Sequence, residues 1–302
     1  MWKRVLKWVA IVLGVALVGA AGFGFAQASA FDASIAKRYD VAAPAIEASQ
    51  DPAAIERGRH LAESLGGCTS CHGADLGGKE GEPMGPLGLL HAPNLTSGKG
   101  GVGKQYSDGQ FARVVRNGIK ANGTSLRFMP SQDFHWWPES DLVALVSYLR
   151  SVPPVDRSMS EGHVGLLGKV LDRLDVLALD VARRIDHTAP PPAVPDPAPT
   201  PEYGAYIGKL CQGCHGTTLS GGPIPGAPPD LPVPTNITPH ETGIKAYTEA
   251  DFMKLLATGT KPDGKQLDPF MPLATLTAMN DIEKKALWAY LRSVPPKAFG
   301  NR

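Results

Sequence analysis

The sequence has few cysteines, no long run of one charge sign and few of the patterns that form β-sheets. Its four cysteines lie in two short motifs, which argues against a scattered disulfide framework. The 30 Lys and Arg nearly balance the 29 Asp and Glu, without a basic run or an acidic tail, so we expect no nucleic-acid partner. Alternating β-branched runs are scarce, while 34 Gly and 28 Pro interrupt the chain, so we expect helices joined by long loops.

Residues 1–30 are expected to be a membrane anchor or a signal segment. Lys3, Arg4 and Lys7 precede an uncharged, largely apolar run, Trp8–Ala26, whose length is close to the ~20 residues that span a bilayer as a helix. The basic flank predicts that the rest of the chain lies outside the cytoplasm. The alternative is a cleaved signal peptide, because Ala28–Ala30 resembles a small-residue cleavage site.

The rest of the chain contains an internal repeat. Tyr148–Pro154 returns with identical letters as Tyr290–Pro296. The same shift along the chain relates Asn94-Leu-Thr96 to Asn236-Ile-Thr238 and Phe128-Met-Pro130 to Phe270-Met-Pro272. The repeat predicts two similar domains, at 50–155 and 201–302.

Residues 156–200, between the domains, are expected to form an amphipathic helix and a Pro-rich linker. Apolar residues recur at steps of three or four from Leu167 to Ile185, as on one face of a single helix. This helix is interpreted as a brace on one domain, or alternatively as a surface for a membrane or a partner. The segment Thr188–Pro201 is typical of a stiff linker that separates domains.

Capping signals predict where the helices of each domain begin. Asp51-Pro52 and Thr200-Pro201 should start helices that run into the cysteine motifs. Ser107 and Thr248 should start the middle helices. The last helices are expected from about Pro138 to Arg150 and from Asn280.

Each domain contains the motif Cys-x-x-Cys-His, formed by Cys68, Cys71 and His72 and by Cys211, Cys214 and His215. A redox dithiol would need a βαβ setting, and a zinc site joining both cysteine pairs would leave the histidines without a role. The motif is the signature of covalent c-type haem attachment. On a helix, positions i, i+3 and i+4 share one side, so the cysteines can reach the haem vinyl groups and the histidine can reach the iron. The sequence therefore predicts two covalently bound haem c groups.

A methionine at the same place in both repeats is expected to be the second axial ligand. Met129 follows Cys68 at almost the same separation as Met271 follows Cys211, and each methionine lies between Phe and Pro. His135 is the nearest alternative in the first domain, and the second has no equivalent of it. The remaining histidines are expected to be surface or local polar residues: His60, His91, His163, His187 and His240.

These motifs resemble class I c-type cytochromes over about two-thirds of the chain. The matching residues of the first domain are Cys68–Gly73, Ala92–Thr96, Phe128–Pro130 and Tyr148–Pro154, each with a second copy. The resemblance implies an all-α fold of two tandem small helical domains, preceded by a single N-terminal transmembrane helix. It also implies that a backbone carbonyl holds each iron-binding histidine, from Pro93 in the first domain and from Thr235 in the second.

More closely, the chain is similar to membrane-bound cytochrome subunits of periplasmic dehydrogenases or respiratory complexes. This implies electron transfer without catalysis, as a shuttle or as a subunit. The expected partners are a dehydrogenase, a quinol-oxidising complex or a terminal oxidase. The expected location is the bacterial cytoplasmic membrane, single-pass, with the haem domains in the periplasm, or the soluble periplasm if the signal is cleaved. The alternative is a dihaem cytochrome c peroxidase, against which the paired methionines argue. A haem-based sensor would require an attached signalling domain.

Overall fold

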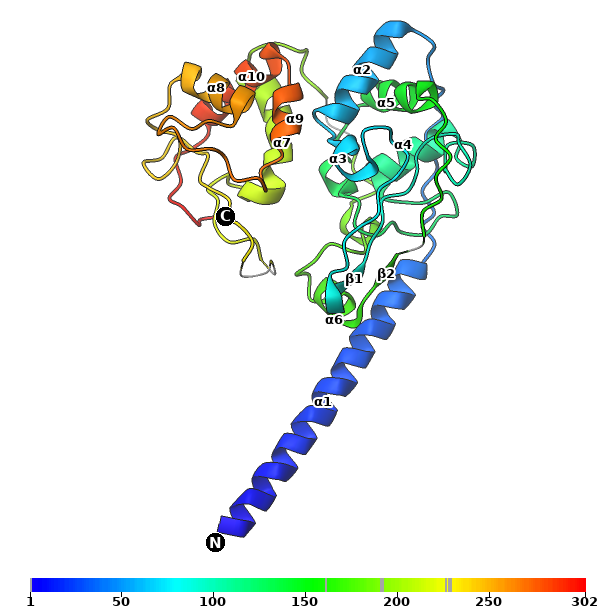
Figure 1. The fold of residues 1–302 in the computed structure, drawn as a ribbon, viewed down its shortest axis with the longest axis vertical. Coiled ribbons are helices and arrows are strands. Elements are labelled where there is room, and N and C mark those ends of the chain that lie inside the picture. The colour runs from blue at the N-terminus through cyan, green and yellow to red at the C-terminus, as the bar shows by residue number, and fades with distance from the viewer. Residues whose placement is uncertain (1, 161, 191–192, 226, 228–229) are drawn as a thin grey trace.

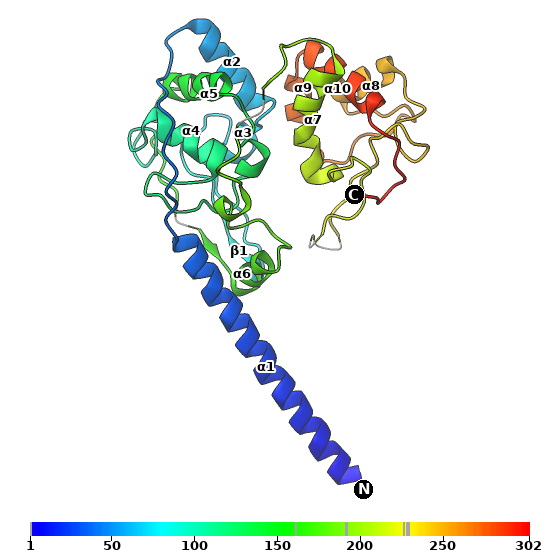
Figure 2. The same ribbon diagram turned by 180° about the vertical axis from the view of Figure 1, so that it is seen from behind.

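The computed structural model describes residues 2–160, 162–190, 193–225, 227 and 230–302. A long N-terminal helix leads into two helical domains that lie side by side (Figures 1 and 2). Among the described residues, the only sheet is the antiparallel pair β1 (Gly88–Leu89) and β2 (His163–Val164). The all-α fold class is therefore confirmed.

Helix α1 (Trp2–Ala36) contains the apolar run and continues past it into the first domain. Its most apolar 18-residue window has a mean hydropathy of 2.3 and no residue buried by the rest of the protein. Only Phe31 and Ile35, near its C-terminal end, are buried. The helix is long and apolar enough to cross a membrane, and its last turns fix it to the first domain.

The first domain contains α2 (Pro52–Glu63), α3 (Cys68–His72), α4 (Asp108–Asn117) and α5 (Glu139–Ser151). The Asp51 side chain caps α2, and Ser107 and Gln110 form a reciprocal capping box on α4. The prediction that α2 runs into the cysteine motif is wrong. The chain breaks before α3, where Gly67 has a φ of +55°, a left-handed conformation that favours glycine.

The second domain contains α7 (Pro201–His215), α8 (Glu249–Thr258), α9 (Leu273–Ala278) and α10 (Asp281–Ser293). Here the first helix does run through the cysteine motif without a break. Thr248 and Asp251 form a capping box on α8, and Asn280 and Glu283 form one on α10. The predicted starts of these helices are confirmed.

In each domain the first and last helices pack closely at a glycine. A Cβ on Gly58 would lie 1.9 Å from the carbonyl oxygen of Ala144, and one on Gly204 would lie 2.0 Å from that of Ala286. The two alanines are related by the shift of the repeated motifs, and the two glycines, which meet them in the same way, by a slightly larger shift. Neither glycine was predicted from the sequence, because both lie outside the matched motifs.

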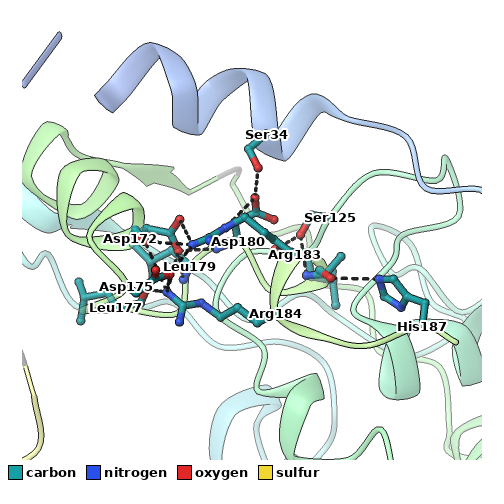
Figure 3. A network of polar contacts seen from close by, with 12 residues as sticks. Ser34, Ser125, Asp172, Asp175, Leu177, Leu179, Asp180, Arg183, Arg184 and His187 are labelled. Atoms are coloured by element: carbon teal, nitrogen blue, oxygen red, sulfur yellow. Dashed lines mark hydrogen bonds and ion pairs between the residues drawn. The ribbon is translucent and has the colours of Figure 1, made fainter. Parts of the chain in front are cut away.

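The prediction of one helix from Leu167 to Ile185 is wrong. Helix α6 covers only Leu166–Arg173, and Asp175 then adopts a φ of +59°. Figure 3 shows why the chain turns: the carboxylate of Asp172, which is fully buried, accepts the backbone N–H groups of Leu179 at 2.8 Å and Asp180 at 3.0 Å. These bonds give the backbone an alternative to helical pairing.

The same segment connects α1 to the first domain, as the brace interpretation expects. Ser34 of α1 donates a hydrogen bond to Asp180 (Figure 3). Lys169 of α6 pairs with Asp32 of α1 at 2.6 Å. Val181 and Ala182 are buried beyond the turn. The end of α1 and residues 166–185 therefore form one supporting structure.

The prediction that the linker separates the domains is also wrong. Pro191 and Pro192, in the middle of the Pro-rich run, lie outside the described residues. Among the described residues, buried side chains of both domains belong to one continuous hydrophobic cluster. In that cluster the rings of Trp136 and Tyr206, one from each domain, meet edge to face at 4.7 Å. The two domains therefore share a core.

A charged network crosses this shared interface. Arg57 makes two hydrogen bonds of 3.0 Å to Asp141, which also accepts a bond of 2.7 Å from the Tyr206 hydroxyl. The Nε2 atom of His60 lies 2.8 Å from both carboxylate oxygens of Glu283, which has no exposed surface. The prediction that His60 is a surface or local residue is wrong, because its partner belongs to the other domain.

Candidate functional site

In the first domain, the two cysteines and the histidine of α3 differ in their exposure to solvent. Cys71 is exposed, Cys68 is partly buried and His72 is buried. The Nδ1 atom of His72 lies 2.8 Å from the carbonyl oxygen of Pro93, so Nδ1 carries the proton and Nε2 keeps its lone pair. Burial lowers the pKa of His72, which favours the neutral imidazole that binds a metal, although the hydrogen bond to Pro93 opposes this.

The second domain repeats this arrangement. The Nδ1 atom of His215 lies 2.7 Å from the carbonyl oxygen of Thr235, and burial again lowers the pKa of the histidine. Thr235 has a side chain unlike that of Pro93, but both residues contribute the same backbone group. The contact that the resemblance implies is thus present in both domains.

An asparagine next to each of these carbonyls holds the loop in place. Asn94 donates to the carbonyl of Val155 at 2.7 Å and accepts the Thr96 N–H at 2.9 Å. Asn236 donates to the carbonyl of Lys297 at 2.7 Å in the same way. The Asn-x-Thr repeat was visible in the sequence, but its role was not, because each carbonyl partner lies 61 residues further along the chain.

The cysteines do not form a shared metal site. Burial raises the pKa of both Cys68 and Cys211 to about 12. Within the described ranges, no three His, Cys, Asp or Glu side chains are placed to hold a metal ion together.

The two candidate methionines are partly buried beside the hydrophobic core. Met129 follows Phe128, whose φ is +70°, and leads into the 3-10 turn Ser131–Asp133. Met271 lines a cleft of about 450 Å³. The rival His135 is hydrogen-bonded by Nδ1 to the carbonyl of Gln132 at 2.7 Å, within its own turn.

These residues fit a covalently bound haem c. Each domain offers a pair of thiols for thioether bonds, an imidazole with a free Nε2 and a methionine thioether. The first domain also has a buried polar atom without a protein partner, Nε1 of Trp137, whose ring edge lies beside Gly66. A buried indole N–H requires an acceptor, and a haem carboxylate can supply one.

Comparisons with known proteins agree with this geometry. The sequence profile of the family "Cytochrome c" matches residues 55–153 and 203–295. The chain is 26% identical over 279 residues to the fructose dehydrogenase cytochrome subunit of Gluconobacter japonicus, covering 83% of this chain and 54% of that protein. It is 36% identical over 105 residues to the alcohol dehydrogenase (quinone), cytochrome c subunit of Gluconacetobacter polyoxogenes, covering 32% and 22%. It is also 36% identical over 107 residues to the gluconate 2-dehydrogenase cytochrome c subunit of Pantoea cypripedii, covering 33% and 24%. The chain thus spans about half of the first relative and a smaller part of the others.

Proposed function

Because the chain belongs to the cytochrome c family, with two such domains that each carry a covalent haem c, we propose that it is the membrane-anchored electron-transfer subunit of a dehydrogenase complex. The observation that carries this proposal is the repeated pairing of a buried motif histidine with a backbone carbonyl, at His72–Pro93 and His215–Thr235. Such a hydrogen bond fixes the tautomer and orientation of a metal-binding imidazole.

The residues of each site have separate roles in this proposal. Cys68 and Cys71 hold the haem of the first domain, and Cys211 and Cys214 hold that of the second. His72 and His215 would each supply an imidazole ligand to the haem iron of their domain. Met129 and Met271 would each supply a thioether ligand. The haem, when bound, supplies one-electron iron chemistry, and a methionine ligand raises its reduction potential.

Filled coordination supports an electron carrier rather than the peroxidase alternative. A peroxidase needs one iron with an open position and an acid or base beside it. In this chain both domains place a partly buried methionine at the equivalent position. The protein then contributes an apolar setting and control of potential, and leaves substrate chemistry to another subunit.

The dehydrogenase partner is suggested by the relatives. They are named as cytochrome subunits of fructose, alcohol and gluconate dehydrogenases. A substrate-oxidising subunit would donate electrons to one haem, and a quinol-linked complex or terminal oxidase would accept them. The subunit role is preferred to a free shuttle on this ground.

The membrane anchor is proposed to be α1, with the haem domains in the periplasm. Its apolar window is not buried by the protein, and Lys3, Arg4 and Lys7 lie at its N-terminal end. Leu166 and Leu167 of α6 are also exposed, and α6 packs against α1 where that helix meets the domain. A domain resting on the bilayer would cover these leucines.

This function predicts that gentle detergent extraction recovers the tagged chain from membranes together with a dehydrogenase. Adding alcohols, sugars or sugar acids to that preparation should reduce its haems, as seen in the visible spectrum. A chain that lacks Met1–Ala26 and carries a cleavable signal should be soluble and hold both haems. A native mature protein that starts near Phe31 would contradict the anchor. A membrane preparation whose haems no such substrate reduces would contradict the dehydrogenase role.

A further inference from the structure

The interface between the domains pairs equivalent positions of the repeat. Asp141 and Glu283 are related by the same shift as the repeated motifs, and each lies in the first turn of the last helix of its domain. Asp141 accepts a hydrogen bond from Tyr206 of the second domain, and Glu283 contacts His60 of the first. Reciprocal contacts of this kind are the pattern of a two-fold symmetric interface.

The same symmetry brings the turn after each methionine onto the cysteine motif of the other domain. Asp133 lies four residues after Met129. A Cβ on Gly213, between Cys211 and Cys214, would lie 3.6 Å from its Oδ2 atom, and α7 contacts the Ser131–Asp133 turn. The carboxylate of the first domain therefore faces the cysteine motif of the second.

The reciprocal contact involves Thr275, four residues after Met271. A Cβ on Gly67, just before Cys68, would lie 3.3 Å from the Thr275 hydroxyl oxygen. Ser70, between the first two cysteines, lines the same cleft as Met271. Because each follows its methionine by the same step, Asp133 and Thr275 occupy equivalent positions of the repeat, one of them charged and the other neutral.

The ionisation of Asp133 sets the charge beside the motif it faces. Burial raises the pKa of Asp133 itself to about 6, and nearby His135 opposes this shift. Asp133 is therefore ionised at pH 8.

We propose that the negative charge of Asp133, in the first domain, lowers the reduction potential of the haem attached at Cys211 and Cys214 of the second domain. We call this group haem 2, and the one at Cys68 and Cys71 haem 1. A nearby negative charge stabilises oxidised iron, which carries one more positive charge than reduced iron. The equivalent residue beside the motif of haem 1 is the neutral Thr275, so the interface makes the two haems unequal. This inference rests on the proposed haem attachment.

The test measures the two reduction potentials by spectroelectrochemical titration of the full dihaem protein at pH 8. Met129→Ala and Met271→Ala, each made separately in the wild type and in the interface variants, assign the potentials. The potential that falls with Met129→Ala belongs to haem 1, and the one that falls with Met271→Ala belongs to haem 2. Asp133→Asn should raise the potential of haem 2 more than that of haem 1, although Asp133 belongs to the domain of haem 1. Thr275→Asp should do the reverse and lower the potential of haem 1.

Asp263→Asn is the matched control, because Asp263 is an exposed carboxylate paired with Lys265. It should leave both potentials unchanged. If Asp133→Asn mainly shifts haem 1, or if neither interface variant shifts a potential, the inference is overturned. Loss of a covalent haem from the wild type would instead overturn the proposed function, so the two failures are distinguishable. Thr275→Asp keeps the inference testable if Asp133→Asn does not fold.

Discussion

Met271→Ala is expected to open the coordination of haem 2 and to lower its reduction potential. Loss of the thioether ligand favours oxidised iron, because methionine stabilises the reduced state relative to harder ligands. The near-infrared sulfur-to-iron band of the oxidised protein should fall to half its intensity. After reduction at neutral pH, the variant should bind about one carbon monoxide per chain, whereas the wild type should bind almost none.

Met129→Ala should have the same effects on haem 1. Met84→Ala is the control, because Met84 is an exposed methionine that is not a candidate ligand, and it should change neither the band nor carbon monoxide binding. A wild type with one high-spin haem would contradict methionine ligation of both irons. Peroxide turnover at that haem would favour the peroxidase alternative.

Glu283→Ala should destabilise the whole protein strongly, because it removes a fully buried carboxylate from the interdomain network. His60 and Arg57 would each lose a negatively charged neighbour, at 2.8 Å and 3.6 Å in the wild type. Breaking a buried ion pair typically costs about 3–5 kcal/mol. We expect the lower end, because the Arg57 side chain is 29% exposed and keeps its bonds to Asp141. Urea unfolding followed by circular dichroism measures the loss.

Glu241→Ala removes a carboxylate of an exposed ion pair with Lys245 and is the matched control. It should not change the unfolding midpoint, because exposed ion pairs contribute little. The wild type should unfold in one transition, since the domains share a core. Two separate transitions in the wild type, or equal midpoints for the two variants, would contradict this description of the interface.

Sequence reasoning worked where structure depends on neighbouring residues. The caps at Asp51, Ser107 and Asn280 are local hydrogen bonds within a few residues, and they were predicted at the correct positions. The cysteine motifs are equally local. The carbonyl contacts of His72 and His215 were predicted only because the family resemblance implies them.

It failed where a distant group decides the local conformation. The apolar spacing from Leu167 to Ile185 is typical of a helix. However, the buried Asp172 carboxylate accepts hydrogen bonds from two backbone N–H groups further along the chain, and the chain turns there. His60 has no distinctive sequence neighbours, and its partner Glu283 is 223 residues away. Gly58 is required by the backbone of α5, which the sequence does not place beside it. In each case the deciding contact exists only in the folded protein.

The intact mass of the purified protein shows whether the chain holds two covalent haem c groups. The mass should exceed that of the polypeptide by two haems, and both haems should stay on the protein through acid–acetone extraction. Substituting both cysteines of one motif should remove one of them. A wild-type mass without this increment, or haem that extracts freely, would contradict the account.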